Sequence, residues 1–185
     1  EGYLKRGLKE AASCGDDGSI LAILNELMGY YRAAGRYEEC LLCTRQAMEL
    51  ADELGLDGTV QYRTMLLNAA TGYRAAGKYQ EAETLYGQAY EIYRRYITGP
   101  DYHMASLHNN LSLLYSETGR LKEAKRELER AMEIVRKLDD ADVEVAITHT
   151  NLGNLCFQMN ETAEGKAHME QVVRILEKMP DGNLC

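Results

Sequence analysis

The sequence predicts an all-α fold, a solenoid of about nine helices stacked as antiparallel pairs. Three observations lead to this prediction. A motif recurs along the whole chain of 185 residues, and a period in this range is typical of solenoids. Apolar residues on both sides of each recurring glycine follow the three- and four-residue spacing of an amphipathic helix. The chain contains 2 prolines, so it has few turn-forming residues for a many-stranded β-sandwich or barrel.

The repeat is easiest to see around the glycine that interrupts each copy. Glycine recurs at Gly35, Gly77 and Gly119, a constant spacing of 42 residues. The surrounding segments are YYRAAGRYEECLLCTRQAMEL (30–50), GYRAAGKYQEAETLYGQAYEIY (72–93) and LLYSETGRLKEAKRELERAMEIV (113–135). A fourth copy, residues 154–176, has Asn160 in the glycine position. Asn is a common replacement for Gly where φ is positive, so we expect the same turn in all four copies.

Each copy predicts two antiparallel helices joined by this turn. In chain order we expect a half repeat over 1–16, whose helix spans about 2–13, and then whole repeats over about 17–58, 59–100, 101–141 and 142–179, followed by a tail at 180–185. Good N-cap residues occupy equivalent positions at the start of each whole repeat: Asp17, Thr59, Asp101 and Asp142. The only internal proline, Pro100, falls in a connection between repeats, where a helix has to be interrupted. The prediction is one continuous domain over 1–185.

Charge and composition exclude several classes of partner. The 21 basic and 29 acidic residues leave a net charge of −8, which argues against nucleic acid or an anionic membrane surface. No apolar run approaches the length of a membrane span, and we expect a cytoplasmic protein. The five cysteines are an odd number scattered through periodic apolar segments, as expected for buried thiols in a reducing compartment.

Four positions of the repeat carry a resemblance to a known family. An aromatic residue stands four before the turn glycine (Tyr31, Tyr73, Tyr115) and an apolar one two after it (Tyr37, Tyr79, Leu121). A small residue follows (Cys40, Ala82, Ala124, Gly165), and seven residues later comes alanine (Ala47, Ala89, Ala131), with Val172 in the last copy. This pattern resembles the tetratricopeptide repeat family. Its period exceeds the usual 34 residues and is similar to that of the long-helix subclass found in kinesin light chains.

The resemblance implies a right-handed superhelix with the first helix of each pair lining the concave surface. It also implies a non-catalytic scaffold that binds an extended peptide segment of a partner protein in that groove. In kinesin light chains and related proteins, asparagines contact the peptide main chain, and the resemblance implies this role for Asn68, Asn110 and Asn151. The full set of expected peptide-binding residues is Asn25, Asn68, Arg74, Asn109, Asn110, Leu113, Asn151, Asn154 and Phe157.

A carboxamide both donates and accepts hydrogen bonds, so it matches a peptide backbone without depending on side-chain sequence. Leu67, Leu113, Ile147 and Phe157 are expected to form shallow apolar pockets beside these amides. Acidic and basic residues cancel in the predicted lining, so we expect a nearly neutral groove. In the alternative interpretation the asparagines only solvate a helix face. Family members that clamp the C-terminal carboxylate of a chaperone need lysine and arginine at the clamping positions. The corresponding positions here are Asn, Thr, Leu and Ser, which argues against that role.

Other clusters predict little chemistry. Cys40 and Cys43 form a C-x-x-C within an amphipathic helix, where core packing is favoured over redox activity or zinc binding. His108 and His149 occupy equivalent positions on adjacent first helices, so they suggest either ordinary packing, which we favour, or a facing pair that binds metal or senses pH. His103 and His168 have no evident partner. We therefore predict no catalytic residue, no metal site and no cofactor.

The last predicted helix has an apolar surface that a terminal capping helix should not expose: Val172, Val173, Ile175, Leu176 and Met179. We expect further chain or a second copy to cover it. This supports a second functional hypothesis, a peptide- or effector-sensing regulatory domain within a larger signalling or transcription-regulating protein.

Overall fold

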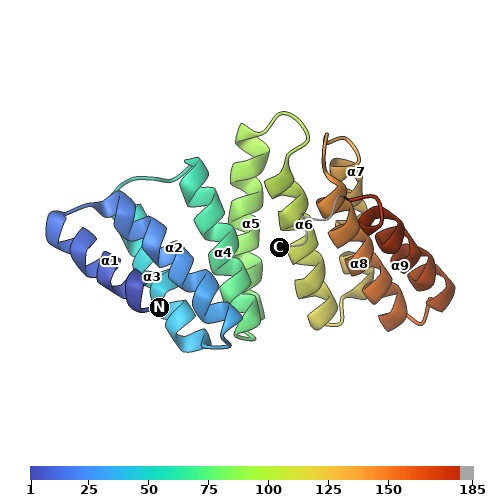
Figure 1. Ribbon diagram of the computed structural model, residues 1–185, viewed down its shortest axis with the longest axis horizontal. Coiled ribbons are helices and arrows are strands. Elements are labelled where there is room, and N and C mark those ends of the chain that lie inside the picture. The colour runs from blue at the N-terminus through green and yellow to red at the C-terminus, as the bar shows by residue number, and fades with distance from the viewer. Residues whose placement is uncertain (180–185) are drawn as a thin grey trace. The chain divides into compact units, whose positions relative to one another are not determined.

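The structure, a computed structural model, describes residues 1–179 apart from the side chain of Val60, and the predicted tail at 180–185 lies outside this range. Within it the chain forms nine α-helices and no strand (Figure 1). They are α1 (Gly2–Cys14), α2 (Asp17–Ala33), α3 (Tyr37–Glu53), α4 (Val60–Ala75), α5 (Tyr79–Tyr96), α6 (Tyr102–Glu117), α7 (Leu121–Val135), α8 (Asp142–Gln158) and α9 (Thr162–Leu176). The helix boundaries follow the predicted half repeat and four whole repeats.

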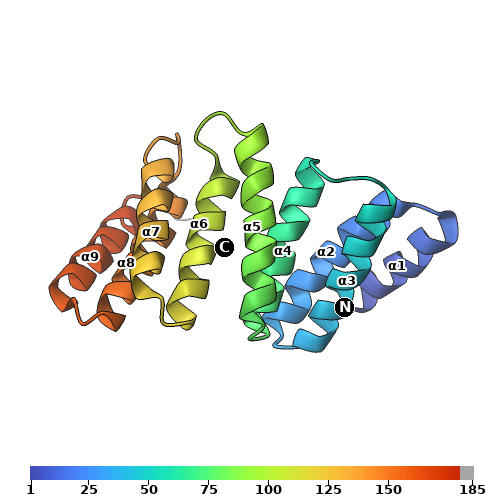
Figure 2. The same cartoon turned by 180° about the vertical axis from the view of Figure 1, so that it is seen from behind.

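The chain divides into two compact units, Glu1–Arg95 and a second unit that begins at Tyr96. The first contains α1 to α5 almost entirely, and the second contains α6 to α9. Within the first unit, α2 lies in front of α3 in Figure 1 and behind it in Figure 2, so the two helices of the pair belong to different layers. The single continuous domain stays a prediction.

Positive φ angles occur at the turn position of every repeat. φ is 70° at Gly35, 73° at Gly77 and 77° at Gly119, and Asn160 adopts 63°. The residue after each turn donates its backbone N–H to the carbonyl five residues earlier, as Arg36 does to Tyr31 at 2.8 Å. This closes the helix end in the usual left-handed C-cap arrangement. The prediction that Asn160 replaces glycine is confirmed.

Two of the four predicted N-caps are confirmed. Thr59 accepts a hydrogen bond from the Tyr62 N–H, and Asp101 accepts from two backbone N–H groups. The other two predictions are wrong by one residue. The cap of α2 is Asp16, and Ala141 precedes α8, so that Asp17 and Asp142 are the first residues of their helices. At this position their carboxylates interact favourably with the positive N-terminal end of the helix dipole.

Each unit has a core built from the small and apolar repeat positions. In the first unit Leu27, Met28, Tyr31 and Cys40 are buried together. In the second, Ala105, Ala124 and Leu128 form the equivalent cluster with residues of α8. Small side chains at the crossing points let neighbouring helices approach closely, which is why the small-residue position recurs in every copy.

Candidate functional site

The second unit has a hollow of about 410 Å³ between its two first helices, α6 and α8. Four of the predicted peptide-binding residues line it: Asn109, Asn110, Leu113 and Asn151. The exposed side chain of Ile147 adds an apolar wall. The sequence therefore identified residues from two helices that the fold does bring together.

A second hollow of about 360 Å³ continues along the same helices toward their C-terminal ends. It shares Leu113 and Asn151 with the first hollow and adds Asn154 and Phe157. The two hollows thus form one continuous surface, which we call the α6–α8 groove. Six predicted binding residues line this groove: Asn109, Asn110, Leu113, Asn151, Asn154 and Phe157.

The first unit has a hollow of about 740 Å³ at the same place in the repeat. Asn25 lines it ten residues before Gly35, just as Asn109 lines the other hollow ten residues before Gly119. Gln61 and Glu144, each sixteen residues before the next turn residue, form the facing walls. Further lining residues that match in register are Ala22 with Ser106, Glu26 with Asn110, and Thr64 with Ile147.

Asparagine pairs bridge the two first helices in each unit. In the first unit the Asn68 side chain donates to Asn25 Oδ1 at 2.8 Å. In the second, Asn151 donates to Asn109 Oδ1 at the same distance. Each bond joins the residue ten before one turn to the residue nine before the next. The amides expected as a row of separate groups are therefore joined, since the fold pairs four of them.

Asn109 has the most extensive contacts of these amides. Its side-chain nitrogen donates to the Ala105 carbonyl at 3.2 Å and to Thr148 Oγ1 at 3.0 Å, while its oxygen accepts from Asn151. The residue is 8% exposed. Both N–H groups are therefore used inside the protein, and Asn109 serves to hold α6 against α8 and to orient Asn151.

Asn110 and Asn154 have different surroundings. The Asn110 amide donates back to the Ser106 carbonyl of its own helix at 2.9 Å, and Asn154 is exposed. Neither residue makes a side-chain hydrogen bond to another helix in the described part of the chain. Phe157 is 40% exposed, and its ring lies against the backbone of α9, since a Cβ added to Gly165 would lie 2.6 Å from Phe157 Cε1.

Arg74 lies away from the hollow of the first unit, near the end of α4. Its guanidinium is close to the buried Tyr86 hydroxyl, which also contacts Thr71 at 3.1 Å. Burial raises the pKa of Tyr86, while Thr71 and Arg74 partly oppose this shift. The position ties Arg74 to the packing of α4 against α5, and its expected role in peptide binding stays a prediction.

The hollows carry negative rather than balanced charge. Glu26 lines the hollow of the first unit, and Glu144 lines that of the second beside His103. Neither hollow is lined by lysine or arginine among the described residues. The neutral groove expected from the sequence balances Glu26 and Glu117 against Arg32 and Arg74, but neither arginine lines these hollows.

Histidine pairing differs from the expected arrangement. His108 Nδ1 lies 2.6 Å from Glu127 Oε2, and His149 Nδ1 lies 2.9 Å from His168 Nδ1. His108 and His149 therefore each contact the second helix of their own pair, and His168 has a partner that the sequence did not reveal. Both contacts span 19 residues and occupy the same repeat positions. The sequence does hold a signal for these contacts. Glu127 and His168 occupy equivalent positions of the second helices, opposite the equivalent His108 and His149.

Cys40 and Cys43 are both buried in the core of the first unit, so the core-packing interpretation of the C-x-x-C is confirmed. Burial raises the pKa of both thiols. This opposes the thiolate form that redox chemistry requires.

At the end of the second unit, Val173 and Leu176 of α9 are exposed. A hollow of about 270 Å³ opens beside Leu176 and Met179. What covers this surface stays a prediction. None of the helices within residues 1–179 combines the length and apolar character needed to cross a membrane.

A family model described as tetratricopeptide repeat matches residues 19–95 and 103–178, most of the chain. The chain belongs to the tetratricopeptide repeat family. The predicted family is therefore confirmed, and members of this family generally serve as scaffolds for protein–protein interaction. No curated protein sequence matches the chain.

Solved structures confirm the fold of this tetratricopeptide repeat chain. BtubC (BKLC) from P. vanneervenii is 23% identical with a TM-score of 0.77, and the match covers 89% of this chain and 68% of the BtubC chain. A putative kinesin light chain with nearly identical TPR-like repeats from P. anserina is 21% identical with a TM-score of 0.73, covering 97% and 86%. MamA protein is 13% identical with a TM-score of 0.55, covering 100% and 96%. The predicted all-α solenoid of kinesin light chain type is therefore confirmed.

Proposed function

We propose that this tetratricopeptide repeat chain is a non-catalytic scaffold that binds an extended peptide segment of a partner protein along its first helices. The observation that carries the proposal is the recurrence of one hollow at the same repeat positions in both units. Packing alone does not require a hollow there, whereas an extended ligand that crosses successive repeats would meet the same surface each time.

The amides around these hollows suit a peptide main chain. In the first unit, Asn25 lines the hollow and Asn68 holds its oxygen, which leaves the Asn25 amino group to bond a ligand. In the α6–α8 groove, Asn110 and Asn154 lie beside the bridged Asn151. Donors and acceptors held at fixed positions on rigid helices pair with backbone groups at a small entropic cost.

The apolar and charged lining indicates which side chains such a peptide would carry. Leu113 and Ile147 offer apolar contacts in the hollow that Asn151 also lines. Glu144 lines the same hollow, and no lysine or arginine does among the described residues. We therefore expect a segment that alternates apolar residues with polar or basic ones, and weaker binding of acidic segments.

The test is a peptide selected from a random library on the wild-type chain, labelled and titrated by fluorescence polarisation. Asn110→Ala combined with Asn154→Ala should weaken its binding about 10- to 50-fold, since each lost hydrogen bond is worth about 1 kcal/mol. These two residues are chosen because neither bridges helices, so the variant should keep its circular dichroism spectrum and melting temperature.

Gln171→Ala is the matched control, because Gln171 is an exposed amide on α9, outside the lining of the groove. It should leave the dissociation constant unchanged. Raising the salt concentration should weaken a lysine-containing peptide more than its neutral analogue. Unchanged binding by the Asn110→Ala, Asn154→Ala variant would show that the α6–α8 groove is not the binding surface.

A further inference from the structure

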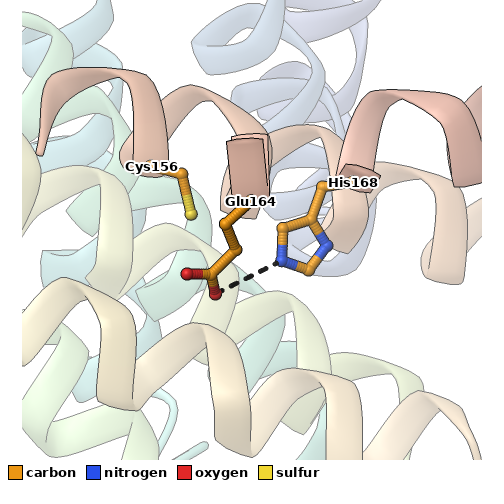
Figure 3. Close-up of side chains that lie close together, drawn as sticks. All are labelled: Cys156, Glu164 and His168. Atoms are coloured by element: carbon orange, nitrogen blue, oxygen red, sulfur yellow. Dashed lines mark ion pairs between the residues drawn. The ribbon is translucent and has the colours of Figure 1, made fainter. Parts of the chain in front are cut away.

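The last helix pair gathers a set of side chains that commonly bind metal ions. Cys156 comes from α8, and Glu164 and His168 come from α9 (Figure 3). One ligand atom from each of the three lies within 4.8 Å of the other two. Cys156 is buried, His168 is half-buried and Glu164 is exposed, so an ion could reach the cluster from the Glu164 side.

We propose that Cys156, Glu164 and His168 form a Zn²⁺ site that joins α8 to α9. Thiolate, imidazole and carboxylate are the three protein ligands of zinc, with bonds of about 2.0–2.3 Å. In a tetrahedral site such ligands lie roughly 3.5 Å apart. The cluster must therefore contract by roughly 1 Å, and the exposed, flexible side chain of Glu164 can provide most of that movement.

The helices supply this arrangement through their own geometry. Glu164 and His168 are four residues apart on α9 and so share one face of the helix. His168 Nε2 lies 3.9 Å from Glu164 Oε1. Cys156 is in the last turns of α8, directly before the turn at Asn160 that brings α9 alongside. A short connection thus holds ligands from both helices together without any metal.

His149 supports the site from the other side of the imidazole ring. Its Nδ1 is 2.9 Å from His168 Nδ1, while Nε2 of His168 is the nitrogen nearer to Glu164. Histidines that bind zinc usually engage their second nitrogen in a hydrogen bond, which fixes the orientation of the ring. With both rings neutral, His168 can donate this bond to His149. His149 is accordingly a positioning residue.

The charges around the cluster balance a bound zinc ion. Lys125 Nζ lies 2.9 Å from Glu161 and 3.3 Å from Glu164, so Glu161 is its closer partner. The two carboxylates exceed the lysine by one negative charge. Zinc binding would release the proton of Cys156 and add a second negative charge, which offsets the two positive charges of the ion.

Zinc binds cysteine as a thiolate, so Cys156 must release its proton when the ion binds. Burial raises the pKa of this thiol, and the carboxylate of Glu164 adds to the shift. Because zinc must displace the proton, its affinity should increase with pH.

The experiment titrates the metal-free chain with Co²⁺, a spectroscopic substitute for zinc. We expect saturation at one ion per chain, with a thiolate-to-cobalt charge-transfer band and tetrahedral d–d absorption that excess Zn²⁺ removes. Zinc at about 100 times its dissociation constant should also raise the folding equilibrium constant about 100-fold, seen as a higher melting temperature.

Substitutions identify the ligands. Cys156→Ser and His168→Gln should abolish the charge-transfer band or weaken binding beyond detection. Glu164→Gln should weaken zinc binding at least about 10-fold, and because Glu164 is exposed this variant tests the site even if the others fold poorly. Controls are Cys14→Ser, at an exposed thiol in the first unit, and His103→Gln, at an exposed imidazole on α6.

Both controls should bind cobalt as the wild type does. Cys185, which lies outside the described residues, is replaced by serine in every protein tested so that its thiol contributes no signal. A charge-transfer band that survives Cys156→Ser, zinc affinity unchanged by Glu164→Gln, or no zinc-dependent change in melting temperature would overturn the proposal.

Discussion

At the scale of single residues, equivalent repeat positions carry different chemistry in the same geometry. Leu24 and Cys43 belong to one apolar core cluster, eleven residues before and eight after Gly35. The same two positions hold His108 and Glu127 in the third repeat, within 2.6 Å of each other. The backbone thus sets which positions meet, and the side chains decide whether the contact is apolar, ionic or suited to metal binding.

The buried thiols of the first unit lead to a prediction of reactivity. Burial raises the pKa of Cys40 and Cys43, so at pH 7 their reactive thiolate forms should be scarce. Iodoacetamide should modify the exposed Cys14 within minutes and leave Cys40 and Cys43 unmodified until the chain unfolds. Peptide mass mapping measures this at each site.

Labelling of Cys40 and Cys43 should stay slow when the pH is raised toward 9, because burial raises the pKa of both thiols. Rapid labelling of Cys40 or Cys43 at neutral pH would contradict their assignment to the core.

At the scale of helices, two glycines set the close approach of α8 and α9. A Cβ added to Gly153 would lie 2.8 Å from Met169 Cε and 3.2 Å from the Gly165 carbonyl oxygen. A Cβ at Gly165 would meet the Phe157 ring at 2.6 Å. Glycine therefore occupies these helical positions despite its low helix propensity, because the neighbouring helix fills the space a side chain would need.

Replacing a helical glycine by alanine raises helix propensity but adds a methyl group that must find space. Gly165→Ala gains roughly 0.5–1 kcal/mol of helix propensity but must displace the Phe157 ring, an overpacking cost of about 1–3 kcal/mol. We expect a net loss of about 1 kcal/mol in the free energy of unfolding, measured by urea denaturation. Because Phe157 lines the α6–α8 groove, the same variant should also weaken peptide binding.

Gly87→Ala is the comparison. Gly87 lies within α5, and a Cβ added there would meet no atom within 4 Å. This variant should gain about 0.5–1 kcal/mol. A stabilising effect of Gly165→Ala equal to that of Gly87→Ala would show that Phe157 is not held against α9.

At the scale of the whole molecule, the repeats behave as linked local units. Helices of this chain pack mainly on their neighbours in sequence, such as α2 on α3 and α8 on α9. Stability in such proteins is approximately a sum of repeat and nearest-neighbour terms. The net charge of −8 favours solubility and steers basic rather than acidic ligands toward the surface.

Because the helices pack mainly on their neighbours, a cavity in one unit should destabilise that unit and leave the other unchanged. Met28 is fully buried in the first unit. Met28→Ala should lower the stability of that unit by about 2–5 kcal/mol. Hydrogen exchange followed by mass spectrometry should show faster exchange across α2 and α3, with rates in α8 and α9 unchanged within about twofold. The reciprocal variant, Met132→Ala in α7, should spare α2 and α3. Equal loss of protection in both units would instead indicate the single cooperative domain predicted from the sequence.

The sequence by itself determined the features that depend on neighbouring residues. Helix periodicity, the positive φ at Gly35 and Asn160, and the cap at Thr59 arise within a few residues of chain, so composition and spacing predicted them. The boundary at Asp16 was missed because two adjacent aspartates can each cap a helix.

Only the tertiary structure decided the partners of the polar side chains. Asn68 meets Asn25 from 43 residues away, and His168 meets His149 from 19. The sequence places these residues on the correct helices and repeat positions. Which atoms approach to hydrogen-bonding distance depends on how the helices cross, and side-chain packing between helices determines that crossing.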